Sequence, residues 1–389
     1  FTLRNLEIVH SSNFQGKSLL DIIDKTSTAM GGRLLRRRLI LPLKSVNEIN
    51  RRLSLIEFFN KEESLKFEIL DLLKGISDLD RLVGKLAAEK ISPKELGYLR
   101  QSLINIQKIR ELLSSHHDVL AWLEPLNNLE ELISYLLNHL NEELPVNLNK
   151  GNVIKSEVSE ELDRLRNLQT KGKGFLDEMC QREIERTGIS SLKIDFNNVF
   201  GYYIEVRNTH KDKVPEDWIR KQTLVNAERY ITEELKEYET QILGAEEKIS
   251  QIEHQLYRQV CENVMMYIDQ IQENSRLIAE LDGAVSLSEL AISENYTKPI
   301  LNENFAIDIK EGRHPIIEKS LPLGEKYIPN DVFLDKDSQQ IIMVTGPNMA
   351  GKSAILRQTA IVCLLAQIGS FVPAKYAEIG ILDKIFTRV

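Results

Sequence analysis

The sequence lacks most of the features that mark secreted, membrane-bound or zinc-binding proteins. Its 389 residues contain three cysteines, which are widely spaced and form no C-x-x-C pair, so neither a disulfide framework nor a zinc site is expected. No apolar run approaches the roughly 20 residues of a membrane span, and no signal peptide is recognisable. We therefore predict a cytoplasmic protein that makes no contact with a membrane.

An excess of positive charge is also missing. The formal net charge is −8, which argues against a protein that binds nucleic acid over its whole surface. A local basic patch remains possible, because the field at the contact surface decides such binding. Hydrophobic residues make up 42% and charged residues 28% of the chain, a composition typical of globular proteins, and the length suits two or three domains.

A glycine-rich loop near the end of the sequence carries the clearest chemical signal. Residues 346–353 read G-P-N-M-A-G-K-S, which is the G-x-x-x-x-G-K-[ST] phosphate loop. We expect a buried strand over 341–345 and a helix afterwards, because apolar residues recur at helical spacing from Ile355. In this setting backbone N–H groups converge on an anion at a helix N-terminus. We predict that ATP or ADP binds to eight residues: Gly346, Pro347, Asn348, Met349, Ala350, Gly351, Lys352 and Ser353.

Two of these residues are assigned catalytic roles. Lys352 would contact the β- and γ-phosphates, and the Ser353 hydroxyl would be a ligand of Mg²⁺. Hydrolysis also needs a second acidic strand, yet only Glu378 and Asp383 are acidic after Ser353, and neither ends an apolar strand. Residues 381–389 resemble the start of a further strand. We therefore expect a piece of a longer polypeptide that binds ATP without turning it over.

Residues 1 to about 295 are predicted to be mostly helical. Ser92, Pro93 and Glu95 form a strong helix start, with a serine N-cap and a glutamate able to complete a capping box. Two long helices with near-heptad apolar stripes are expected, one reaching about Glu185 and one from about 232 to 271. The second would span roughly 60 Å, so both are interpreted as arms.

Strand formers interrupt this helical pattern between the two arms. Residues 192–196 alternate, Asn197-Asn198 indicates a turn, and 200–206 are rich in β-forming residues, so we predict a small β insertion at the tip of a helical hairpin. After residue 296, prolines and glycines separate short apolar runs. That pattern fits the antiparallel first part of an α/β ATPase domain.

Taken together, these segments resemble the MutS family of DNA mismatch-repair ATPases. The phosphate loop at 346–353 matches the family's G-P-N-M-[GS]-G-K-S. Further matches are E-G-R-H-P at 311–315, G-S-F-V-P-A at 369–374, F-T-R-V at 386–389, F-G-Y-Y-I at 200–204, N-A-E-R-Y at 226–230 and G-R-L-L at 32–35. The resemblance covers essentially the whole chain.

The resemblance implies a multidomain, mainly α fold. Long helical lever arms would carry a small β clamp at their tip, followed by the N-terminal half of an α/β P-loop ATPase domain. The corresponding boundaries are 1–172 for the core and lever, 173–232 for the clamp, 233–295 for the returning lever and 296–389 for the truncated ATPase part. It also implies an ATPase that binds mismatched double-stranded DNA, uses ATP and Mg²⁺ to switch into a clamp state, forms a homodimer, acts with a MutL-type partner and is nucleoid-associated.

The resemblance assigns further site residues. In the clamp, Arg220, Lys221 and Asn226 are expected to contact DNA phosphates without reading sequence. Tyr327 lies where the family stacks an aromatic ring on adenine, although it could simply cover apolar surface. Asn348 could contact a phosphate or serve the turn alone. His314 is interpreted as a structural hydrogen-bonding residue.

The alternative that the sequence leaves open is a structural coiled-coil P-loop ATPase of the chromosome-maintenance type. Such proteins also join a phosphate loop to antiparallel arms. The β insertion, the P-N-M loop and the R-H-P segment argue against this alternative.

Overall fold

The computed structural model describes residues 2–11, 16–197, 201–322, 324–347 and 351–387. The chain is mainly helical and divides into two compact units. The first unit comprises residues 1–91, 98–133 and 267–389, and the second comprises 92–97 and 134–266. No helix in the described ranges is long and apolar enough to span a membrane.

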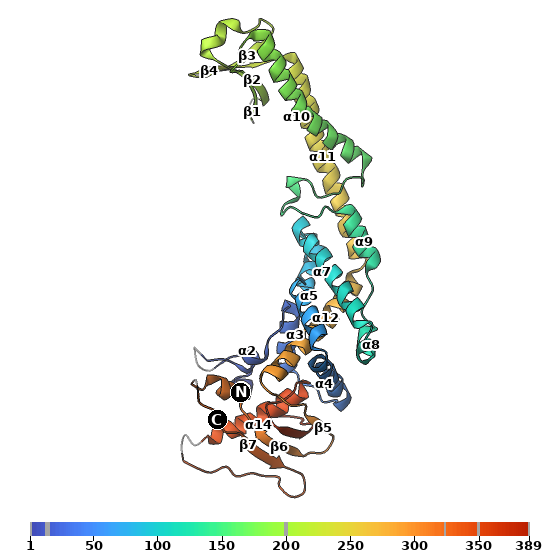
Figure 1. Cartoon of the computed structure of the whole chain (residues 1–389), viewed down its shortest axis with the longest axis vertical. Coiled ribbons are helices and arrows are strands. Elements are labelled where there is room, and N and C mark those ends of the chain that lie inside the picture. Colours follow the sequence, from blue (N-terminus) through green and yellow to red (C-terminus); the bar gives the residue numbers. More distant parts are fainter. Residues whose placement is uncertain (1, 12–15, 198–200, 323, 348–350, 388–389) are drawn as a thin grey trace. The chain divides into compact units, whose positions relative to one another are not determined.

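One buried helix organises the helical part of the first unit. Helix α12 (Ile268–Ser293) is buried on most of its sides, because most residues from Leu277 to Leu290 are apolar or small. Other helices pack round it (Figure 1). They are α2 (Leu19–Ile23), α3 (Ala29–Ile40), α4 (Val46–Lys61), α5 (Glu63–Lys74) and α6 (Leu79–Ala87). Shorter or boundary-crossing helices are α1 (Thr2–Asn5), α7 (Pro93–Leu113), α8 (His117–Leu123) and α9 (Glu130–His139).

A buried carboxylate on α12 fixes the start of α3. Asp282 accepts hydrogen bonds from the backbone N–H groups of Ser27 (2.9 Å) and Thr28 (2.8 Å) and from the Thr28 hydroxyl (2.6 Å). Burial raises the pKa of Asp282 above its ordinary value. Only glycine fits at position 31, since a Cβ there would stand 2.3 Å from Asp282 Oδ2, which these hydrogen bonds hold in place.

The last part of the first unit holds a four-stranded sheet in the order β5-β8-β6-β7. The strands are β5 (Ile300–Asn302), β6 (Ile307–Gly312), β7 (Asn330–Leu334) and β8 (Tyr376–Gly380). Strand β6 is antiparallel to both of its neighbours, whereas β5 and β8 are parallel. Helices α13 (Pro315–Ser320) and α14 (Lys352–Gln367) accompany this sheet, and α14 buries its C-terminal half.

Two strand predictions in this region are wrong. Residues 341–345 form no strand, and Ile341 and Met343 are 83% and 86% exposed. Residues 381–387 also lack strand structure. The physical reason is shared: a strand is stable only when a neighbour satisfies its backbone hydrogen bonds, and no described strand pairs with either segment.

The second unit is built on two long helices that pack against each other, α10 (Glu160–Thr187) and α11 (Glu233–Met265). Gln169 binds Glu246 at 2.9 Å and Arg182 binds Glu234 at 2.5 Å between them.

The predicted capping box at the start of α7 is present, with Glu95 accepting from the Ser92 backbone at 3.1 Å. The short helix η1 (Leu148–Lys150) also belongs to this unit.

The predicted helix over 232–271 is wrong in its extent. Helix α11 begins at Glu233 as expected but ends at Met265, and α12 starts afresh at Ile268. Neither proline nor glycine stands at the break, so the sequence contains no local signal for it.

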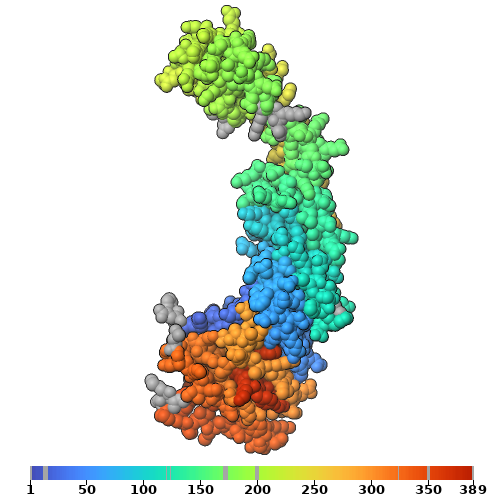
Figure 2. All heavy atoms as spheres, in the orientation of Figure 1, coloured from blue at the N-terminus to red at the C-terminus, as the bar shows by residue number. Residues whose placement is uncertain are grey.

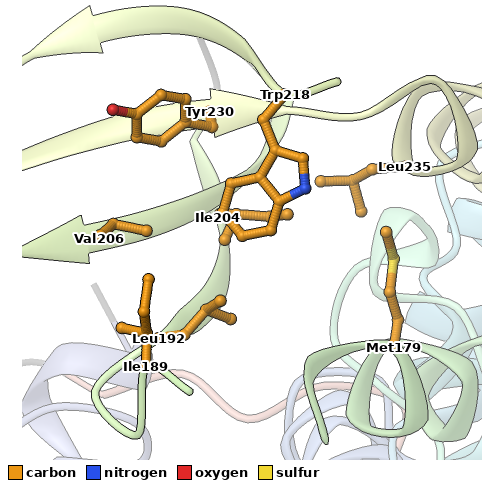
Figure 3. Close-up of a cluster of buried hydrophobic side chains, with 8 residues drawn as sticks. All are labelled: Met179, Ile189, Leu192, Ile204, Val206, Trp218, Tyr230 and Leu235. Atoms are coloured by element: carbon orange, nitrogen blue, oxygen red, sulfur yellow. The ribbon is translucent and has the colours of Figure 1, made fainter. Parts of the chain in front are cut away.

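The predicted β insertion is present as a second four-stranded sheet, in the order β1-β2-β4-β3. Its strands are β1 (Lys193–Asn197), β2 (Gly201–Arg207), β3 (Ile219–Thr223) and β4 (Ala227–Ile231), and the short helix η2 (Asn208–Lys213) joins β2 to β3. These strands and loops form one closely packed body, drawn in light green in Figure 2. One face of the sheet packs on α10 and α11 through an apolar cluster that includes Trp218, Tyr230 and Leu235 (Figure 3).

Candidate nucleotide and DNA sites

The phosphate loop leads directly into α14. Gly351 is the N-cap of this helix and has φ +83°, a left-handed conformation that glycine adopts without strain. The N–H groups of Ala354 and Ile355 donate to the Gly351 carbonyl at 2.9 and 3.2 Å, which closes the first turn. Backbone donors at such a helix start remain free for an anion. Of the predicted loop residues, Asn348, Met349 and Ala350 lie outside the described residues.

The Lys352 side chain crosses the described part of the loop. Its Nζ donates to the Gly346 carbonyl at 2.7 Å, across six positions of the sequence. This contact joins the two ends of the described part of the loop. An incoming phosphate would offer a charged acceptor in place of a carbonyl oxygen, and charge-assisted hydrogen bonds are the stronger kind.

Ser353 lies in the first turn of α14 and is exposed, with no hydrogen bond to its hydroxyl among the described residues. Its hydroxyl is therefore free to become a metal ligand. The two acidic residues that follow it are engaged elsewhere. Glu378 accepts from Asn302 (2.6 Å) and from the Tyr376 hydroxyl (2.9 Å), and Asp383 pairs with Lys44.

The described residues therefore suit a phosphate group and one protein ligand to Mg²⁺. No cluster of three or more His, Cys, Asp or Glu side chains within the described ranges is placed to hold a metal ion.

Tyr327 contacts the same helix that begins at the phosphate loop. Its hydroxyl donates to Gln358 Oε1 at 3.0 Å, and the Asn330 amide donates to that oxygen at 3.3 Å. Gln358 is fully buried, and a Cβ on Gly312 would stand 2.5 Å from its Nε2. Lys352 and Gln358 are six residues apart on α14, or about 9 Å along the axis. The sequence gives no indication that Gln358 binds Tyr327 and Asn330, since a glutamine in the middle of a helix belongs to no motif.

His314 has the structural role that the sequence predicts. It is buried and is the N-cap of α13, where its Nδ1 accepts from the Ile317 N–H at 3.3 Å. Burial, aided by the nearby Arg357 charge, lowers the pKa of His314 to about 4. The imidazole is therefore neutral at physiological pH, with Nδ1 free of a proton.

The candidate DNA surface centres on one buried carboxylate in the second unit. Glu228 accepts a hydrogen bond from the Tyr230 hydroxyl, and Lys211 and Arg220 approach it at 3.6 and 3.5 Å. The side chains of Lys211 and Arg220 stay 56% and 58% exposed. The Tyr230 hydroxyl and the two cations lower the pKa of Glu228, so it remains ionised. Glu228 thus orients two cations that still face solvent.

Lys221 and Asn226 are also exposed. Lys221 is the extra residue of a β-bulge, since the register of β3 with β4 shifts between Arg220 and Gln222. Bulges of this kind redirect a side chain. Asn226 lies in the β3–β4 turn, and its carbonyl accepts from the Asn208 N–H at 3.2 Å. Arg220 and Lys221 thus lie on β3, and Asn226 lies in the turn that follows it.

Other polar and aromatic residues of this sheet are already engaged. The Arg229 guanidinium lies 4.1 Å from the Tyr203 ring centroid and binds Glu205 (3.2 Å) and Gln222 (3.1 Å). The Arg229 guanidinium is thus engaged within the sheet. Tyr202 contacts Phe196 and Tyr238, so its ring is also occupied within the protein.

Comparisons with known protein families identify two segments of the chain. A family model described as "MutS domain III" matches residues 1–288, and one described as "MutS domain V" matches residues 342–389. The first match alone covers well over half of the chain, and the second contains the phosphate loop and α14.

Curated relatives align with the entire chain. A protein of Flavobacterium psychrophilum is 56% identical over 391 aligned residues, one of Bacteroides thetaiotaomicron 52% and one of Cytophaga hutchinsonii 51%. Each is named "DNA mismatch repair protein MutS". The alignments cover 100% of this chain but only 45–46% of those proteins, so the chain spans less than half of their length. The chain therefore belongs to the MutS family.

Proposed function

We propose that this chain is part of a DNA mismatch-repair ATPase and contributes its nucleotide-binding loop and a DNA-contacting sheet. The names of the relatives support the repair function. The match over residues 1–288 supports the MutS assignment against the chromosome-maintenance alternative. The single observation that carries the nucleotide part is the helix start at Gly351, where Lys352 reaches back to the Gly346 carbonyl.

The nucleotide proposal assigns ATP or ADP to residues 346–353, with Lys352 on the β- and γ-phosphates and Ser353 on Mg²⁺. Lys352→Ala removes a charge-assisted contact worth about 1.5–3 kcal/mol, so nucleotide affinity should fall roughly ten- to a hundredfold. Titration with a fluorescent ADP analogue measures this change.

Lys336→Ala is a matched control for that titration. Lys336 is an exposed lysine of the same unit that forms no ion pair with any described residue. Equal affinity in the Lys352→Ala and unaltered chains would contradict the assignment. In the full-length protein, Lys352→Ala should also abolish steady-state hydrolysis by removing the charge that stabilises the transferring phosphoryl group.

The chain by itself should bind nucleotide without turnover. The support for this expectation is local: the two acidic residues that follow Ser353 are already bound to Asn302, Tyr376 and Lys44. Phosphate release by the purified chain that disappears in Lys352→Ala would contradict this expectation.

The DNA proposal places duplex phosphates against Arg220, Lys221 and Asn226, with Lys211 beside them. Such contacts are electrostatic and independent of sequence. Changing Arg220 and Lys221 together to glutamine should weaken binding to homoduplex and mismatched DNA alike. The slope of log K against log salt should fall by about two at most, near one per lost phosphate contact.

Lys236→Gln with Lys248→Gln is the matched control, because both lysines are exposed on α11 and the double variant removes the same charge. An unchanged salt slope in the Arg220/Lys221 variant would place the DNA contact elsewhere. Loss confined to mismatched DNA would mean that this sheet reads the lesion.

We extend the proposal to the full-length protein, in which nucleotide state would switch the grip on DNA, a homodimer would form and a MutL-type partner would be engaged. These steps rest on the membership of the chain in the MutS family. A nucleotide-dependent change in the DNA dissociation rate of the full-length protein would test the switch.

A further inference from the structure

A cavity of about 260 Å³ lies within the first unit, and no residue of the phosphate loop lines it. Helices α3, α4 and α12 contribute to its wall, together with Trp122 and with Gly369, which follows α14. Four arginines and two glutamates line it, which is a formal net charge of +2. The two glutamates offset only half of the arginine charge in this lining, so the remaining positive charge favours a further anion.

Arg38 is the most informative residue of the lining. Only 6% of its surface is exposed, and its guanidinium makes no hydrogen bond or ion pair with any described residue. Burial and the neighbouring Arg52 charge lower the pKa of Arg38 to about 10, so it is still charged at neutral pH. Uncompensated buried charges cost several kcal/mol each. A native structure therefore retains one mainly where something pairs with it.

The other three arginines of the lining differ in their partners. Arg52 donates through Nη1 to the Ile368 carbonyl at 3.0 Å. Gly369 lets it lie there, because a Cβ on Gly369 would stand 2.6 Å from the Arg52 Cβ. Arg276 binds Glu280 at 2.6 Å, and Glu280 acts on Arg38 only through its charge, which raises the pKa of Arg38 but leaves its guanidinium without a hydrogen bond. Arg51 is exposed and makes no ion pair within the described ranges.

We infer that this arginine-lined cavity is a binding site for a phosphate-type polyanion, separate from the phosphate loop. Guanidinium groups match phosphate oxygens through paired N–H donors. A volume of about 260 Å³ would hold roughly eight water molecules, so it exceeds one phosphate group and has room for a diphosphate. The Trp122 indole N–H, which is buried and has no acceptor among the described residues, is a further donor in the wall.

The test uses pyrophosphate as the probe and Trp122 as the reporter. The chain has two tryptophans, and Trp218 lies in the second unit, so Trp218→Phe leaves Trp122 as the single tryptophan. Pyrophosphate should change Trp122 emission in a saturable way, and the same change should persist when Lys352→Ala is added. Arg38→Met should weaken this binding roughly ten- to a hundredfold, the equivalent of one charge-assisted contact.

Two further variants keep the test decisive. Arg37→Met, an exposed arginine on the same helix, should leave the affinity unchanged. Arg51→Gln should weaken binding without touching a buried residue, which covers the case in which Arg38→Met fails to fold. Without ligand, Arg38→Met should unfold at a higher temperature than the unaltered chain, because it removes an unpaired buried charge.

The inference is overturned if emission does not saturate, if Lys352→Ala removes the response, or if Arg37→Met weakens it as much as Arg38→Met. A response to a tetraglutamate peptide but not to pyrophosphate would also overturn it, and would assign the cavity to an acidic polypeptide segment instead.

Discussion

The His314 ring caps α13 only while its Nδ1 carries a lone pair. Protonation would turn that nitrogen into a donor facing the Ile317 N–H, in a buried place close to Arg357. The folded state therefore resists protonation, and the pKa of His314 falls from 6.5 to about 4. The unfolded chain binds this proton more readily, so His314 makes folding depend on pH.

The sign follows from proton linkage. Between pH 6.5 and about 4 the unfolded state holds more protons at this residue, so stability is lost as the pH falls through that window. We expect the first unit to lose roughly 2 kcal/mol from His314 between neutral pH and about pH 4.5. Urea denaturation followed by Trp122 emission, in the Trp218→Phe background, measures the loss.

His314→Asn is the matched variant for this prediction, because asparagine is also a good N-cap but does not titrate. Its stability should change less with pH than that of the unaltered chain, by about that same amount. Parallel pH profiles for the two chains would rule out His314 as the source.

At the residue scale, the sequence predicts the role of a residue when that residue belongs to a local motif. The structural hydrogen-bonding role of His314 is of this kind, and the structure makes it the N-cap of α13. The burial of Arg38 and the pairing of Tyr327 with Gln358 could not be predicted. Both depend on which helix packs opposite, and such long-range contacts leave no pattern near either residue.

Helix α14 links the phosphate loop to the sheet through Gln358. The Gln358 amide accepts from Tyr327 and Asn330 and donates to the Asn330 carbonyl at 3.4 Å. Gln358→Leu would keep the volume but leave these buried groups without partners. The expected loss is about 1–3 kcal/mol of unfolding free energy, measured by urea denaturation with Trp122 as reporter.

Tyr327→Phe separates the hydrogen bond from the aromatic ring. It should cost less stability than Gln358→Leu, and the double variant should lose less than the sum of the two single changes, since both remove the same contact. Full additivity would mean that Tyr327 and Gln358 act independently. If Tyr327 stacks on adenine, Tyr327→Phe should keep the nucleotide affinity and Tyr327→Ala should lower it.

At the scale of helices and strands, prediction succeeds where the sequence pattern is sufficient by itself. The alternation over 192–196 predicts β1, the β-forming residues over 200–206 predict β2, and the serine N-cap predicts the start of α7. The expected strand at 341–345 is wrong because apolar β-forming residues do not make a strand without a pairing neighbour. The break between α11 and α12 after Met265 could not be predicted, because neither proline nor glycine lies there.

At the scale of the whole molecule, the motifs identify the MutS family, and the family matches confirm it. The prediction of a mainly helical chain with small sheets is also confirmed. The predicted domain boundaries and the site residues stay predictions. Composition alone would not predict a DNA-contacting surface, since the net charge of the chain is negative although Lys211 and Arg220 lie beside Glu228.

The unpaired segment 341–345 has a consequence for how the chain behaves in solution. Ile341, Ile342 and Met343 present an apolar and uncharged stretch to solvent. Such stretches are templates for β pairing between molecules, which is the first step of aggregation. We expect concentrated solutions to scatter light increasingly with time, and Met343→Lys to suppress this by placing a charge in the stretch.

Val225→Lys is the matched control, because it adds the same charge at another exposed apolar residue. Val225 is 92% exposed in the β3–β4 turn, where its carbonyl already accepts from the Asn208 amide. The substitution should leave the scattering unchanged if pairing through 341–345 is the cause. Equal protection by both substitutions would instead point to simple charge repulsion between molecules. Residues 341–345, which precede the phosphate loop, would thus limit the concentration at which this chain stays in solution without aggregating.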